Sequence, residues 1–475
     1  MSYHNILSKF ISTLFILSFL FGNLDAQAYK IKVNFKGYEN DTLLLGYYFG
    51  DKQYIKDTAY KSKDGTFTFQ SDTLLEPGMY LVVTQPEHNY IQILIDKEQQ
   101  KFAIESEAAY LNEKLKFHGS KLNQDFNAYI DFLSDKRMLA DSLNALLKNA
   151  KDEQEKTLTK SKLELVDKLV KDKQQEILQS QAKSILSLVL RWSLDVQVPE
   201  FTDAKPEDRE LLAFQYYKKH FFDQAEFQDD RNVRLPLFYQ KVSRYLERLT
   251  VQHPDSINLA LDMILSKLTP ESQNHKFLLS HFLNTYANSK YVGMDGVYVH
   301  LVENYYAKGK APWIDAENLA KMTKDAKALK PLLIDRIAPD ILLFKEDSTA
   351  FRLHDIKSPY TVLIFWAPDC GHCKKSIPFV NEFYEKFKNR GVEVLAVCSQ
   401  IGTEAKKACF DAVKSHNMLS YINAYDPSHV SRFKIIYDLK TTPQIYILDA
   451  SKKILTKKIG AEQLNEIMDK LLSFK

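Results

Sequence analysis

Two cysteines separated by two residues are the feature of this 475-residue sequence with the clearest chemistry. They lie in the segment Cys370-Gly371-His372-Cys373, shortly after the apolar run Tyr360–Trp366. The run predicts a buried strand, and the pattern over Cys373–Lys388 predicts a helix with one apolar side. A thiol at the first turn of a helix faces free N–H groups and the positive end of the helix dipole, which favours the thiolate.

This spacing suits thiol–disulfide exchange. In that reaction a thiolate attacks a disulfide, and a second thiol resolves the mixed disulfide that forms. Cys370 stands at the exposed start of the expected helix, so we expect it to be the nucleophile. Cys373 lies inside the helix and is expected to be the resolving thiol, so that the two form a redox-active disulfide.

Other chemistries fit the pair less well. A structural zinc site needs four ligands, and only one CxxC pair is present. Covalent haem attachment needs a histidine where Lys374 stands, and the peroxiredoxin pattern needs Thr or Ser where Ala367 stands. We therefore expect no metal and no cofactor. A merely structural disulfide is the remaining alternative, because an exported compartment would allow it.

The sequence has two further cysteines, both after the motif. Cys398 ends a second apolar run, Val392–Cys398, and Cys409 falls in the expected helix Thr403–Asn417. Neither belongs to a motif, so both are expected to be inert packing residues rather than a second redox pair.

The surroundings of the motif resemble the thioredoxin superfamily, in particular the TlpA/ResA-like thiol–disulfide oxidoreductases of bacterial cell envelopes. The resemblance covers about Pro339–Lys475. The matching residues are Phe365, Trp366, Ala367, Pro368, Asp369, Cys370, Gly371, His372, Cys373, Lys374, Lys375 and Pro378, followed by Thr442 and Pro443 before the strand Gln444–Asp449. The resemblance implies a cis-proline at Pro443 that packs beside the cysteines and leaves a backbone edge free for a peptide substrate.

The sequence departs from many thioredoxins at one position. Their buried acid on the strand before the motif would fall at Ile364. Without that acid, the proton of Cys373 must pass to water or to another residue. Asp369 and Glu404 are both candidates, and the sequence does not choose between them.

The composition limits the partners of the protein. With 64 basic and 61 acidic residues the net charge is +3, which speaks against a nucleic-acid-binding surface. The family resemblance implies that the partners are protein thiols or disulfides and an unidentified thiol electron donor. Five histidines lie in the central part of the chain, and none has metal-ligand spacing: His220, His253, His275, His281 and His300.

The first 28 residues resemble a secretory signal. The apolar run Phe10–Phe21 is followed by Ala26-Gln27-Ala28, which predicts cleavage after Ala28. An uncleaved amino-terminal anchor is the alternative. No later stretch is long and apolar enough to span a bilayer. We therefore expect a mature protein in the periplasm or cell envelope, without a membrane span after cleavage.

The remaining chain predicts a multidomain protein. Residues 29–115 contain short alternating strands with turn signals, typical of an antiparallel β-sandwich or barrel. Residues 116–334 form an all-α region that includes an amphipathic hairpin, and residues 335–475 alternate strands and helices as in an α/β thioredoxin-like fold. The long helical region keeps a second hypothesis open, an envelope binding or scaffold protein with a redox-regulated or vestigial thioredoxin-like module.

Overall fold

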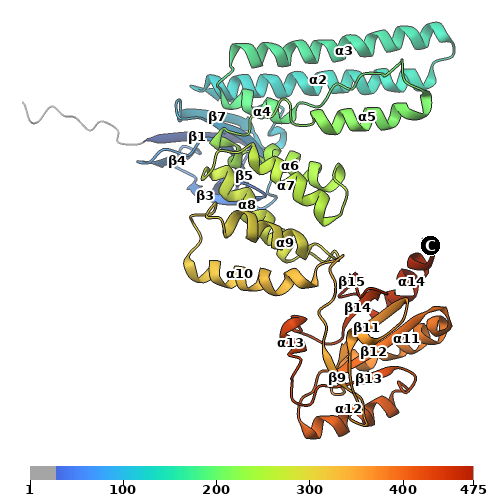
Figure 1. Cartoon of the computed structure of the whole chain (residues 1–475). Coiled ribbons are helices and arrows are strands. Elements are labelled where there is room, and N and C mark those ends of the chain that lie inside the picture. Colours follow the sequence, from blue (N-terminus) through green and yellow to red (C-terminus); the bar gives the residue numbers. More distant parts are fainter. Residues whose placement is uncertain (1–27, 474–475) are drawn as a thin grey trace, which may run out of the picture. The chain divides into compact units, whose positions relative to one another are not determined.

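The computed structural model of the protein describes residues 28–473 (Figure 1). The expected signal sequence therefore lies outside the described residues, apart from Ala28. The chain divides into two compact units, one ending at Tyr245 and one beginning at Leu246. Between residues 28 and 473, no helix is long and apolar enough to cross a membrane.

The first unit begins with two four-stranded sheets, in the orders β4-β1-β7-β8 and β3-β2-β5-β6. The pair β1–β7 is parallel and the other neighbours are antiparallel. The strands are β1 (Tyr29–Lys36), β2 (Thr42–Phe49), β3 (Lys52–Tyr60), β4 (Phe67–Ser71), β5 (Gly78–Thr84), β6 (Tyr90–Ile95), β7 (Lys101–Glu107) and β8 (Lys116–His118).

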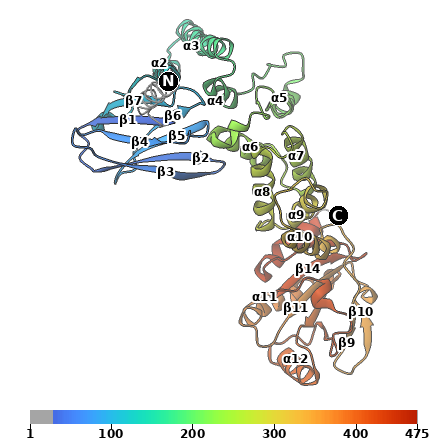
Figure 2. The same cartoon turned by 90° about the vertical axis from the view of Figure 1, so that its left-hand side faces the viewer.

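These two sheets form a sandwich. Side chains alternate between buried and exposed along β1, as expected for a sheet with one face on the core. Ile31 and Ile104 of one sheet share a single core with Leu45 and Ile93 of the other. The expected sandwich is therefore confirmed, and the sheets do not close into a barrel (Figure 2).

The expected helical region follows. A hairpin of α2 (Lys121–Asn149) and α3 (Glu153–Ser180) comes first. Buried Asn123 of α2 bonds both the N–H and the carbonyl oxygen of Leu94, which fixes the start of the hairpin to the sandwich. The later helices are α4 (Ile185–Ser193), α5 (Pro206–His220), α6 (Pro236–Arg248), α7 (Pro254–Ser266), α8 (Gln273–Ala287), α9 (Asp295–Leu301) and α10 (Ala316–Leu329).

The second unit ends in a five-stranded sheet of order β13-β12-β11-β14-β15. β11, β12 and β13 run parallel, and β14 and β15 are antiparallel additions. The strands are β11 (Tyr360–Trp366), β12 (Val392–Cys398), β13 (Ile422–Ala424), β14 (Gln444–Asp449) and β15 (Ile454–Lys457), and a separate pair is formed by β9 (Leu342–Phe344) and β10 (Ala350–Arg352).

Both faces of this sheet are buried, which explains why β11 is a continuous apolar run. On one face, Val362 and Ile364 pack with α11 (Gly371–Phe387), α12 (Thr403–Ser415) and α14 (Leu464–Ser473). On the other face, Phe365 stacks on Phe433 of α13 (Phe433–Ile436). Figure 1 shows α11 and α13 on opposite sides of the sheet. The predicted α/β thioredoxin-like fold is confirmed.

A buried ion pair joins this sheet to the helices of the same unit. Lys457 of β15 donates to a carboxylate oxygen of Asp295 and to the carbonyl oxygen of Leu332. The Lys457 side chain is 3% exposed and that of Asp295 is 22% exposed. Burial lowers the pKa of Lys457, and the nearby Asp295 carboxylate opposes this shift.

Candidate active site

Cys370 lies where β11 passes into α11. It is the N-cap residue of the helix, and its Sγ accepts the backbone N–H of Cys373 at 3.3 Å. Its thiol donates to the carbonyl oxygen of Thr442 at 3.2 Å. Because β14 lies beside β11 and runs antiparallel to it, the loop before β14 lies at the carboxyl end of β11, where the turn to Cys370 begins. The fold thus brings together two motif segments that lie 72 residues apart in the chain.

The two cysteines differ in their exposure to solvent. Cys370 is partly exposed, whereas Cys373 is 1% exposed and packs in the core with Trp366 and Ile377. Both are free thiols, so the structure shows the pair as the reduced dithiol. A substrate can therefore reach Cys370 but not Cys373.

The acidities of the two thiols also differ. Burial alone would raise the pKa of Cys370, but the side-chain hydrogen bonds that it shares with Cys373 and Thr442, together with the backbone N–H groups of the helix start, outweigh burial, and the pKa is lowered. Burial, followed by the hydrogen bond to Cys370, raises the pKa of Cys373 to about 11. The accessible sulfur is consequently the one that ionises more easily.

The other motif residues surround this pair. Trp366 is 2% exposed and is the last residue of β11, while Pro368 in the following turn is partly buried. Gly371 and His372 are exposed at the start of α11. Thr442 and Pro443 are partly buried and joined by a cis peptide bond, as the family resemblance implies.

In the described part of the chain, neither candidate from the sequence serves as a carboxylate partner for Cys373. Ile364 is 6% exposed and apolar, so no acid stands at the expected position on β11. Asp369 and Glu404 are exposed, and within residues 28–473 no hydrogen bond joins either of them to Cys373.

No metal centre is visible in the part of the chain that the structure describes. Across residues 28–473, no three His, Cys, Asp or Glu side chains gather in a way that could hold a metal ion. Two of the central histidines lie beside a carboxylate: the Nε2 of His300 is 2.8 Å from the Oδ1 of Asp262, and the Nδ1 of His220 is 2.6 Å from the Oδ2 of Asp223.

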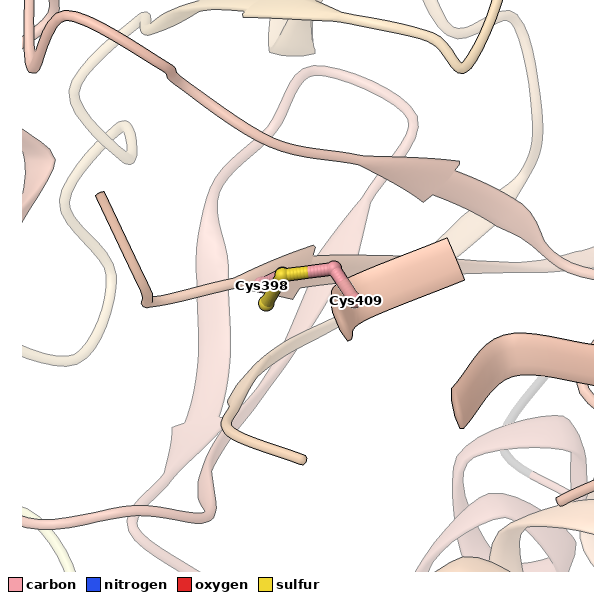
Figure 3. The surroundings of a disulfide bond; sticks show 2 residues. All are labelled: Cys398 and Cys409. Carbon is pink, nitrogen blue, oxygen red and sulfur yellow. A yellow bond between two sulfur atoms is a disulfide. The ribbon is translucent and has the colours of Figure 1, made fainter. Parts of the chain in front are cut away.

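One expectation about the cysteines was wrong. Cys398 and Cys409 are not separate packing residues but form a disulfide with a Cα–Cα distance of 6.1 Å (Figure 3). The strand end of β12 and the middle of α12 come together because both pack on the same core. Spacing along the chain gives no sign of this bond. The signal that could have indicated the bond is that both cysteines belong to apolar positions of their predicted elements, so that both are expected in the core of the same domain.

Comparison with protein families matches each part of the chain separately. Residues 334–472 match the Redoxin family. Residues 168–330 match a domain of unknown function, DUF5106, and residues 29–126 match another, DUF4369.

Individual relatives agree with the first of these matches. The thiol-disulfide oxidoreductase ResA of one Bacillus cereus strain is 30% identical over 143 residues, which cover 29% of this chain and 78% of that protein. ResA of Bacillus subtilis is 27% identical over 132 residues, covering 28% and 70%. A solved domain of a possible thiol-disulfide isomerase from Cytophaga hutchinsonii is 31% identical, covering 30% of this chain and 99% of that domain, with a TM-score of 0.28.

The site lies in the part of the chain that matches the Redoxin family. The match to the Bacillus cereus protein extends over more than two thirds of that relative. The Redoxin match includes β11, α11 and the loop at Thr442. The protein is therefore a thioredoxin-like oxidoreductase that belongs to the TlpA/ResA-like thiol–disulfide oxidoreductases of the thioredoxin superfamily.

Proposed function

We propose that this protein is an exported oxidoreductase that exchanges disulfides with protein thiols through Cys370 and Cys373. The observation that carries the proposal is the asymmetry of the pair. Cys370 is accessible and has a lowered pKa, and Cys373 is buried behind it with a raised pKa. Exchange requires an accessible thiolate that attacks the substrate disulfide and a second thiol that stays protonated until it resolves the mixed disulfide.

The reaction then has two steps. The Cys370 thiolate attacks one sulfur of a substrate disulfide, forms a mixed disulfide, and releases the other substrate sulfur as a thiolate. Cys373, after losing its proton, attacks the Sγ of Cys370 and releases the second substrate thiolate. Two electrons pass from the dithiol to the substrate, and the Cys370–Cys373 disulfide remains. A thiol donor restores the dithiol, and the same steps in reverse would oxidise a substrate.

The surrounding groups serve these steps. The backbone N–H of Cys373 donates a hydrogen bond that stabilises negative charge on the Cys370 sulfur, as expected at a helix start. The carbonyl oxygen of Thr442 accepts a hydrogen bond from the Cys370 thiol in the resting dithiol. With Ile364 in place of an acid, we propose that the proton of Cys373 passes to water or to the leaving substrate thiolate rather than to Asp369 or Glu404.

We propose the periplasm or cell envelope as the location, from the signal-like residues 1–28. The proposed domains are 29–115, 116–334 and 335–475, and only the last carries the reaction. Its partners would be protein thiols and an unidentified thiol electron donor, with no metal or cofactor.

The proposal is tested by reduction of insulin disulfides with dithiothreitol as the electron source. The mature full-length protein should accelerate the reaction, and a Cys370→Ser/Cys373→Ser protein should not. Equal rates for the two proteins would favour a binding or scaffold protein with a vestigial module.

A further inference from the structure

The Cys398–Cys409 disulfide lies beside the reactive turn, on the side of β11 away from Thr442. β14, which follows Thr442 in the chain, borders β11 on one side, and β12 borders it on the other. Cys398, at the end of β12, is in register with Trp366 at the end of β11. Two loops therefore flank the turn that carries Cys370, one at Thr442 and one directly after Cys398.

The loop after Cys398 is fixed at both ends. The N–H of Ser399 donates to the carbonyl oxygen of Trp366 at 2.7 Å, and the N–H of Gly402 donates to that of Pro427 at 3.1 Å. Between them Ile401 is 44% exposed. Since β11 and β12 are parallel, this loop and the turn to Cys370 both begin at the carboxyl ends of their strands. The exposed apolar side chain of Ile401 thus lies at the end of the sheet where substrates react.

The disulfide closes a covalent ring around this loop. It joins Cys398 to Cys409 in α12, at a sequence separation of 11 (Figure 3). The two residues are 2% and 1% exposed and share their core with Trp366 and Cys373. A thiolate must reach a disulfide sulfur to break the bond. In the folded protein neither a substrate nor glutathione can reach this one.

We infer that Cys398–Cys409 is a permanent bond that positions the loop Ser399–Gly402, so that Ile401 contacts the chain beside a disulfide in a protein substrate. The inference rests on the proposed function and adds a substrate class, an extended polypeptide with an apolar residue near its cysteine. A small disulfide reacts at Cys370 without extending to Ile401. Ile401 is then a specificity-determining residue, and the second disulfide is a positioning device that carries no electrons.

The first test concerns exchange. The full-length protein is incubated with reduced glutathione, alkylated while folded, and mapped by mass spectrometry. Cys370 should be alkylated in the folded protein and the buried Cys373 after denaturation without reductant, whereas Cys398 and Cys409 should react only after denaturation in the presence of reductant. Alkylation of Cys398 or Cys409 in the folded protein, or in the denatured protein before reductant is added, would overturn the assignment of a permanent bond.

The second test compares a protein and a small substrate. In Ile401→Ser, kcat/KM for insulin should fall about five- to tenfold, mainly through KM, because one apolar contact is lost. Reduction of the small disulfide DTNB should change less than about twofold. Cys398→Ala/Cys409→Ala should likewise lower kcat/KM for insulin more than the rate of DTNB reduction. The matched control is Leu419→Ser. Leu419 is also apolar, is 68% exposed, and precedes β13, so it lies at the amino end of the parallel strands, away from Cys370.

The outcomes separate the two proposals. Equal loss with both substrates, or no loss in Ile401→Ser, would overturn the inference while leaving the proposed function intact. A wild-type protein that reduces neither substrate would instead refute the proposed function, and the inference with it. Ile401→Ser keeps the disulfide, so the test stands even where the double cysteine variant does not fold.

Discussion

The backbone N–H of Cys373 lies 3.3 Å from the Sγ of Cys370, so the buried residue of the pair donates a hydrogen bond to the partly exposed one. The contact exists because Cys370 caps α11 and Cys373 is in the first turn. It favours negative charge on Cys370, while burial holds the proton on Cys373. One short segment thus provides an attacking thiol and a resolving thiol.

The first prediction concerns trapping. Cys370→Ser should abolish exchange, and Cys373→Ser should accumulate mixed disulfides with substrates through Cys370, because the attack still occurs and the resolution does not. Partners are identified by mass spectrometry of complexes that reductant releases. Trapping through Cys373 in the Cys370→Ser protein would reverse the assignment of the two roles.

The second prediction concerns pH. The pKa of Cys370 is lowered from that of an ordinary thiol by its hydrogen bonds, whereas burial raises the pKa of Cys373 to about 11. As pH rises, the rate of Cys370 alkylation should therefore reach half its maximum at a lower pH than for the thiol of an unfolded peptide with the same sequence. The 13C signal of the Cys373 Cβ should move only at much higher pH. Titration of Cys373 before Cys370 would contradict the electrostatic description of the site.

Much of the thioredoxin-like domain could be predicted from the sequence, because its signals are local. The strands Tyr360–Trp366 and Val392–Cys398 have the predicted bounds, since each is an unbroken apolar run with turn residues nearby. The helix after the motif begins at Gly371, two residues earlier than expected, because the side chain of Cys370 caps it.

The features that could not be predicted depend on distant residues. Lys457 is 162 residues from Asp295, and lysine is ordinarily a surface residue, so nothing in the sequence marks it as buried. The parallel pairing of β1 with β7 is likewise set by the packing of two sheets on one core. The disulfide between Cys398 and Cys409 needs a strand and a helix to meet, which the spacing of 11 does not encode.

The third prediction concerns the buried ion pair. Lys457→Met should destabilise the second unit by about 3–5 kcal/mol, because Asp295 loses its charged partner in a largely buried position. Lys457→Met/Asp295→Asn should recover part of this loss. Hydrogen exchange of peptides covering β15 reports the effect. The neighbouring exposed Lys458 is the control, and Lys458→Met should change stability by less than about 0.5 kcal/mol. Equal effects at both lysines would contradict a stabilising role for the pair.

The fourth prediction concerns export. If residues 1–28 are a cleaved signal, mass spectrometry of protein from the cell envelope should find a mature chain that begins at Tyr29. Replacing Ala28 with a bulky residue such as Phe should block cleavage, because the signal ends in small residues. An intact amino terminus recovered from the membrane fraction of the wild type would favour the anchor hypothesis.

The last prediction concerns His372, which lies exposed between the two cysteines at the positive end of α11. An imidazolium there would add to the helix dipole in stabilising the Cys370 thiolate. Stabilising the reduced form makes the disulfide a stronger oxidant, and about 30 mV corresponds to about 1.4 kcal/mol for two electrons. His372→Pro should therefore make the potential more negative and raise the pKa of Cys370. Equilibration of the full-length protein with glutathione buffers measures the first, and alkylation against pH the second. If neither value moves, the histidine does not tune the pair.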